Sequence, residues 1–196
     1  AEGRHPAPFT VISAEDVARE RWLPLTAPEW SRSYVVELER QAKKQLTIWP
    51  YHTLIGSIGH SLDPELWSAV VWHSLARRVT PNWLVKGSEP LTEHYSIVQP
   101  EIHVPGSVQG TKNQAILDTI AAADLVVIAG EASSHCVLET VEHLVKEFRD
   151  QPDKLERMIL LQDCTSPVVH PQTDFGAIAQ ERFAEFARMG LRLGNS

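Results

Sequence analysis

The stretch Val126-Val-Ile-Ala-Gly-Glu-Ala-Ser-Ser-His-Cys-Val-Leu-Glu-Thr140 decides the fold class, because it reads as a strand, a turn and the start of a helix. The apolar run Leu125–Ala129 is typical of a buried strand, and the Gly-Glu-Ala-Ser-Ser segment after it is typical of a turn. Apolar side chains then recur at helical spacing over residues 134–149. Cys136 lies at the start of this predicted helix.

The same alternation of strands and helices continues on both sides of this stretch. Further strands are predicted at Leu46–Ile48, Trp83–Lys86 and Met158–Gln162, and helices at Ala14–Arg19, Pro28–Gln41, the residues after Asp63-Pro64, Thr111–Ala123 and Asp174–Met189. Strands that alternate with helices favour right-handed βαβ units. We therefore expect a three-layer α/β/α fold with a mostly parallel sheet.

Composition limits the class of protein. A chain of 196 residues with 43% hydrophobic residues is expected to form a single domain over residues 1–196. A formal net charge of −7 argues against nucleic acid as a partner, and no apolar run is long enough to span a membrane. The two cysteines do not make a disulfide framework, so they indicate free thiols and a cytoplasmic location.

Cys136 is the first candidate catalytic residue. The first turn of a helix carries unpaired N–H groups and the positive end of the helix dipole, and both favour a thiolate. The same N–H groups could hold the oxyanion that forms when a thiolate attacks a carbonyl. The alternative is that Cys136 is a small buried apolar side chain, as most cysteines are.

Lys86 is the second candidate, because it ends the apolar run that starts at Trp83. In a parallel sheet the chemistry lies at the carboxyl ends of the strands, and a lysine there could assist a neighbouring thiol. The alternative is a solvated lysine at a strand end. Cys164 also follows a predicted strand, but no neighbour in the sequence would activate it.

Histidine and aromatic residues give weaker signals. His52 follows Trp49-Pro-Tyr, and His60 lies eight residues further on, but the chain has no self-contained zinc motif. Trp49, Tyr51 and Tyr95 could line a substrate pocket or could simply belong to the core.

Three segments together resemble the isochorismatase-like cysteine hydrolases, the family that includes the nicotinamidases. Trp49-Pro-Tyr-His52, followed by Gly56, resembles the family's Trp-Pro-x-His-x-x-x-Gly segment. Lys86-Gly87, with Tyr95-Ser96 downstream, resembles its catalytic-lysine segment. Gly130-Glu-Ala-Ser-Ser-His-Cys136-Val resembles its nucleophile turn.

The resemblance implies a Cys–Lys–Asp triad that hydrolyses a small-molecule amide through a thioester. Cys136 would be the nucleophile and Lys86 would assist it, with the backbone N–H groups of Ala132 and Cys136 as the oxyanion hole. A cis peptide bond is implied between Glu131 and Ala132. His52 would bind a divalent metal, zinc or iron, and a homo-oligomer is expected.

The chain departs from the family pattern before Trp49. The family's Asp-x-Gln-x-x-Phe run and Asp-x-His pair are not found there, and the only aspartate in this region is Asp16. We therefore expect the domain to be incomplete at its N-terminus, lacking its N-terminal strands, and to need a missing segment or another chain to fold. Two alternatives to amide hydrolysis are a non-catalytic binding or assembly module and an isochorismatase-type enol-ether hydrolase.

Overall fold

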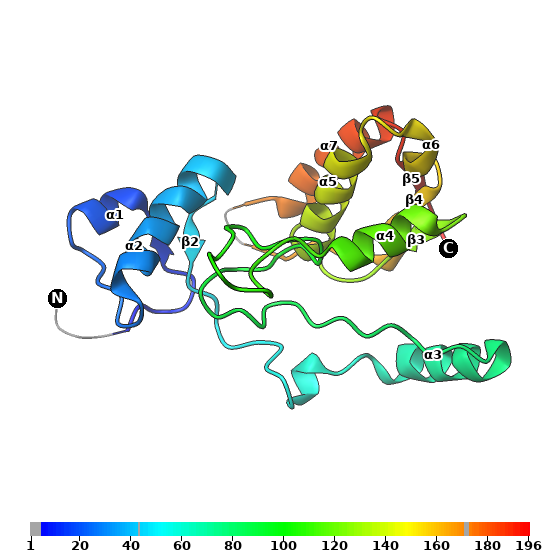
Figure 1. Ribbon diagram of the computed structural model, residues 1–196, viewed down its shortest axis with the longest axis horizontal. Coiled ribbons are helices and arrows are strands. Elements are labelled where there is room, and N and C mark those ends of the chain that lie inside the picture. The colour runs from blue at the N-terminus through cyan, green and yellow to red at the C-terminus, as the bar shows by residue number, and fades with distance from the viewer. Residues whose placement is uncertain (1–4, 43, 171–172) are drawn as a thin grey trace. The chain divides into compact units, whose positions relative to one another are not determined.

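The computed structural model describes residues 5–42, 44–170 and 173–196 (Figure 1). The chain forms two compact units, Ala1–Leu84 and Val85–Ser196, and each is described by itself. The expectation of one domain over residues 1–196 stays a prediction. Within the described residues, no helix is long and apolar enough to cross a membrane.

The first unit contains short elements, most of which the sequence predicts. The helices are α1 (Ala14–Ala18), α2 (Pro28–Glu37), which continues into the π-helical turn η1 (Leu38–Ala42), the 3-10 turn η2 (Ile58–His60) and α3 (Pro64–Arg77). The strands β1 (Val11–Ile12) and β2 (Leu46–Thr47) pair antiparallel. Tyr34, Val35 and Leu38 are buried, as the helical spacing predicts.

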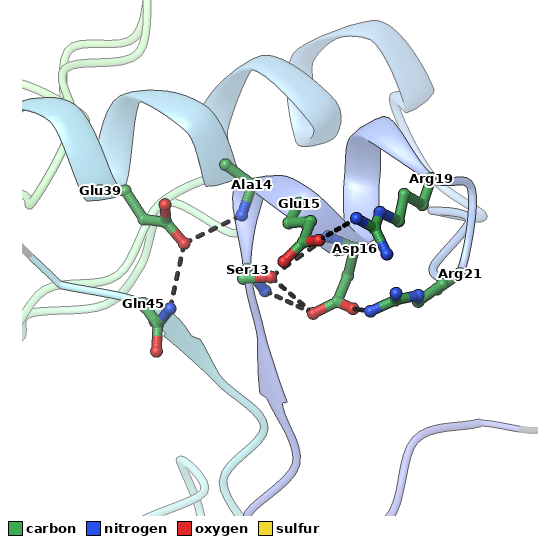
Figure 2. A network of polar contacts seen from close by, with 8 residues as sticks. All are labelled: Ser13, Ala14, Glu15, Asp16, Arg19, Arg21, Glu39 and Gln45. Carbon is green, nitrogen blue, oxygen red and sulfur yellow. Dashed lines mark hydrogen bonds and ion pairs between the residues drawn. The ribbon is translucent and has the colours of Figure 1, made fainter.

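Asp16 has a structural role in this unit. Its carboxylate accepts hydrogen bonds from the backbone N–H and the hydroxyl of Ser13, which caps α1, and it pairs with Arg21 (Figure 2). These contacts lower the pKa of Asp16 below its ordinary value, and the hydrogen bond from the Ser13 hydroxyl contributes most. Glu39 accepts from the Ala14 N–H and from Gln45, which ties α1 to the residues after α2.

The helix α3 begins as predicted, with the Asp63 side chain accepting from the N–H groups of Glu65 and Leu66. Its apolar spacing predicts a buried stripe, but none of its side chains is buried. Trp67 instead stacks on Trp83, with ring centroids 5.6 Å apart.

The predicted strand at Trp83–Lys86 is wrong. These residues have no regular secondary structure, and the side chains of Trp83, Leu84 and Val85 are all exposed. A strand needs a neighbour to complete its hydrogen-bond ladder. The sheets that the described residues form are β1–β2 and β3–β4–β5, and neither pairs with this segment.

The second unit is built on a parallel sheet, which confirms the predicted α/β class. Its strands β3 (Val126–Ile128), β4 (Met158–Leu161) and β5 (Arg192–Gly194) lie in that order. The helices are α4 (Gln114–Ala122), α5 (Cys136–Phe148), α6 (Pro152–Leu155) and α7 (Phe175–Arg188), and the 3-10 turn η3 (Gln162–Cys164) follows β4 (Figure 1). The sequence prediction missed β5 and α6.

The helix α4 begins at Gln114, three residues later than the predicted start at Thr111. The N-cap residue is Asn113, whose side chain accepts from the Ile116 N–H, while the Thr111 hydroxyl donates to the Val108 carbonyl. Asparagine is among the strongest N-cap residues, which accounts for a helix that begins directly after Asn113.

The core of this unit lies between α5, α7 and one face of the sheet. The face of α5 that the sequence predicts is buried, and the core comprises Val137, Val141, Leu144, Val145, Phe148, Leu160, Phe183 and Phe186, among others. Strand β3 is less buried than its apolar run predicts, because its side chains alternate between faces. Val126 and Ile128 pack against the core, whereas Leu125 and Val127 are 55% and 54% exposed.

Leu160 provides a test of this core, because its side chain is fully buried in the central strand β4. Leu160→Ala should lower the free energy of unfolding by about 2–5 kcal/mol, from lost transfer energy and the cavity that remains. Val127→Ala, on the exposed face of β3, is the control and should cost much less. Urea unfolding of both variants measures this, and equal losses would contradict the described core.

Candidate active site

The turn after β3 carries the first group of candidate residues. Gly130 has a φ of +119°, a backbone conformation that side chains rarely adopt, and the Glu131–Ala132 peptide bond is cis, as expected from the resemblance. Cys136 is the first residue of α5. Among the described residues, the backbone N–H groups of Ala132 and Cys136 have no protein acceptor.

Lys86 lies beside this turn. Its Nζ is 3.3 Å from the Cys136 Sγ, although the two residues are 50 positions apart in the chain. The same Nζ donates to the His94 carbonyl at 2.8 Å. The structure therefore brings together the two residues that the sequence singles out for catalysis, even though Lys86 does not end a strand.

A second segment, residues 162–168, holds the turn from the end of β4. The Gly130 N–H donates to the Cys164 carbonyl at 2.9 Å, and the Ser133 N–H donates to the Ser166 carbonyl at 2.8 Å. Because β3 and β4 are parallel neighbours, their carboxyl ends bring the two segments side by side. Cys164 takes part through its backbone; its Sγ lies 3.7 Å from the Asp163 carboxylate.

Aromatic rings gather next to the candidate nucleophile. The ring of Tyr95, a predicted pocket residue, lies 6.0 Å from that of His135, the residue before Cys136. The ring centroids of His135 and Phe175 lie 5.0 Å apart, and those of Phe175 and His170 lie 5.7 Å apart, both pairs in an edge-to-face arrangement. Sequence reasoning missed His135 and Phe175, and only the position of His135 next to Cys136 could have pointed to either.

The other predicted residues belong to the first unit. Trp49 contacts the rings of Phe9 and His52, at centroid distances of 5.9 and 6.2 Å. Tyr51 is 94% exposed.

The described residues do not gather a set of metal ligands around His52. The His52 Nδ1 is 2.7 Å from the Pro50 carbonyl, an arrangement that would leave Nε2 for a metal. A zinc or iron site also needs further ligands. Within residues 5–42, 44–170 and 173–196, no three His, Cys, Asp or Glu side chains come together in a way that could hold an ion.

Lys86 also lines a cavity of about 420 Å³. Its wall includes His94, Gln99, Lys112 and Asn113. Burial lowers the pKa of His94 below its ordinary value, the Lys86 charge acts in the same direction, and the Gln109 carbonyl opposes them. The imidazole is therefore neutral at pH 7, with its Nε2 3.2 Å from the Gln109 carbonyl.

The titration of His94 tests this environment. The His94 ring protons, followed by NMR, should report a pKa below the ordinary 6.5. Because the folded state holds the imidazole neutral, stability is fully present above the unfolded pKa and falls as pH drops towards the folded value. A His94 pKa at or above 6.5 would contradict the described burial.

Comparison with solved structures shows which known proteins share the fold of this chain. No protein-family model matches the chain, and a search of curated proteins finds no match either. Among solved structures, yeast nicotinamidase Pnc1p bound to the inhibitor nicotinaldehyde is similar at a TM-score of 0.53 and 15% identity, covering 78% of this chain and 61% of that one. An Acinetobacter baumanii nicotinamidase pyrazinamidase is similar at a TM-score of 0.54 and 14% identity, covering 98% and 68%.

These similarities define the fold class. The chain shares the α/β fold of these structures, with the parallel sheet and helices described above, in agreement with the isochorismatase-like fold that the sequence predicts. The solved structures that share it are nicotinamidases, in agreement with the family resemblance of the sequence motifs. The chain spans 61% of the length of the yeast enzyme.

Proposed function

We propose that the chain is a cysteine-dependent hydrolase of a small amide, with Cys136 as the nucleophile. The observation that carries the proposal is the 3.3 Å contact between Lys86 Nζ and Cys136 Sγ at the start of α5. An ammonium group beside a cysteine at a helix N-terminus is a known way to favour the reactive thiolate. The fold shared with nicotinamidases supports the same reaction class.

The proposed first step is attack of the Cys136 thiolate on the amide carbon. The new S–C bond pushes the carbonyl electron pair onto oxygen, and the N–H groups of Ala132 and Cys136 bind the resulting oxyanion. When the carbonyl re-forms, the C–N bond breaks, and the Lys86 ammonium gives its proton to the departing amine. This step leaves a thioester on Cys136 and a neutral Lys86.

The second step restores the enzyme. Water attacks the thioester carbon and gives a proton to the neutral Lys86 amine. The S–C bond then breaks, which releases the carboxylic acid and the Cys136 thiolate. Lys86 therefore gives up one proton in the first step and regains one from water in the second. The aspartate that completes the triad in the resemblance stays a prediction for this chain.

The aromatic rings beside the nucleophile support a planar substrate. Tyr95 and His135 lie 6.0 Å apart, and the Phe175 ring adjoins His135. Rings arranged in this way pack well against a flat heteroaromatic group. We therefore propose an aromatic amide of the nicotinamide type as the substrate class, which is also the class that the names of the similar structures indicate.

Two further expectations belong to this proposal. Both cysteines are free thiols, which supports a reducing compartment such as the cytoplasm. A homo-oligomer is proposed from the family resemblance alone.

Ammonia release from a panel of amides tests the reaction. Cys136→Ala should abolish turnover of any amide that the wild-type chain hydrolyses, because no other group would form the thioester. Cys164→Ala is the matched control and should keep its activity. Iodoacetamide should label Cys136 well before Cys164, with loss of turnover in step with the labelling.

Three outcomes would contradict the proposal. They are full activity in Cys136→Ala, labelling of Cys164 before Cys136, and no ammonia from any amide in the panel. In the last case, hydrolysis of an enol ether would point to isochorismatase-type chemistry instead. Binding of a small amide without turnover would point to a non-catalytic module.

A further inference from the structure

Glu131 lies within the turn that follows β3 but takes no part in the proposed chemical steps. Its carboxylate Oε2 accepts two hydrogen bonds from Ser166, one from the backbone N–H at 3.0 Å and one from the hydroxyl at 2.9 Å. Hydrogen bonds to an ionised acceptor are roughly twice as strong as neutral ones. The Glu131 side chain on the turn is therefore hydrogen-bonded to Ser166 in the segment that follows β4.

Ser166 contacts the turn on both sides of Ala132. Besides donating to the Glu131 carboxylate, it accepts a hydrogen bond from the Ser133 N–H through its carbonyl at 2.8 Å. The Ala132 N–H belongs to the planar peptide unit that joins Glu131 to Ala132. Fixing the residues before and after Ala132 therefore fixes the direction of that N–H.

We propose that Glu131 is a positioning residue that acts through Ser166 to aim the Ala132 N–H at the oxyanion. The inference rests on the proposed function, since it concerns the oxyanion hole of the same nucleophile. The Glu131 side chain is exposed and faces water, so its contact with Ser166 adds little to overall stability. Its effect is local, on the geometry of one donor.

A reversible adduct between Cys136 and an aldehyde can separate the effect of Glu131 on the oxyanion donors from any effect on the thiolate. The Cys136 thiolate adds to the carbonyl carbon of nicotinaldehyde, forming an S–C bond, and the carbonyl electron pair moves to oxygen. The adduct therefore depends on the oxyanion donors. Alkylation by iodoacetamide also uses the Cys136 thiolate, but it displaces iodide and forms no oxyanion.

The experiment measures both reactions in matched variants. Glu131→Ala should weaken the nicotinaldehyde adduct about tenfold, a fraction of the hundredfold or greater loss that follows removal of an oxyanion donor. Glu131→Gln keeps an oxygen that can accept from Ser166, so it should stay within about threefold of wild type. Iodoacetamide alkylation of Cys136 should be unchanged in both variants. Glu181→Ala, which removes an exposed carboxylate on α7, is the control.

A double substitution tests whether Ser166 is the link. Ser166→Ala removes the hydroxyl donor and leaves the N–H, so it should weaken the adduct less than Glu131→Ala. Adding Ser166→Ala to Glu131→Ala should cause no further loss, because the contact is already absent. If Glu131→Ala does not fold, Ser166→Ala and Glu131→Gln still give a measurable difference in adduct affinity.

The possible results separate this inference from the proposed function. A weaker adduct in Glu131→Ala at an unchanged alkylation rate supports the positioning role, even if no amide is hydrolysed. An adduct as strong in Glu131→Ala as in Glu181→Ala overturns it, even if amides are hydrolysed. Fully additive losses in the double variant, a parallel fall in alkylation, or no adduct with wild-type protein would also overturn it.

Discussion

The parallel pairing of β3 with β4 is the constraint on which the candidate site depends. In this register Ile128 lies opposite Leu160, so the two strands end at the same edge of the sheet. The turn that leads to Cys136 and the segment that contains Ser166 then meet, and backbone hydrogen bonds from Gly130 and Ser133 join them. The start of α5 is thereby fixed from two directions, by the strand before it and by the neighbouring segment.

The contact between Lys86 and Cys136 is the second interaction of the candidate site, and it does not depend on a strand. Lys86 lies in a segment with no regular structure, yet its Nζ is held by the His94 carbonyl and lies against the Cys136 sulfur. In the proposed mechanism, the hydrogen-bonded turn would supply the N–H groups for the oxyanion, and the tethered lysine would activate the sulfur. The neutral His94 adds no competing positive charge near the lysine.

The sequence predicts some parts of this arrangement well, for identifiable reasons. The helical spacing of Val137, Val141 and Leu144 predicts α5 and its buried face, because apolar side chains at this spacing lie on one side of a helix. The apolar run Trp83–Val85 is different, since a strand also requires a partner, which sequence spacing does not reveal. The β5 strand, Arg192–Gly194, is too short for an alternating pattern to be recognised.

Site residues divide in the same way. The contact between Cys136 and Lys86 is predictable from the sequence motifs, although Lys86 does not end a strand as the sequence predicts. The contact between Glu131 and Ser166, which are 35 positions apart in the chain, is not predictable, because it depends on the register between β3 and β4. His52 matches a metal-binding motif, but a lone histidine makes no metal site without partners from elsewhere.

The central claim is that Lys86 activates Cys136, and the rate of Cys136 alkylation in Lys86→Met tests it most directly. The substitution keeps an unbranched side chain only one atom shorter and removes the charge that faces the sulfur. At neutral pH the second-order rate with iodoacetamide should fall about tenfold, since a hydrogen bond to a charged group contributes roughly 1.5 kcal/mol or more. Lys146→Met, which removes an exposed ammonium on α5, should leave it unchanged. An equal rate in Lys86→Met and wild type would contradict the claim.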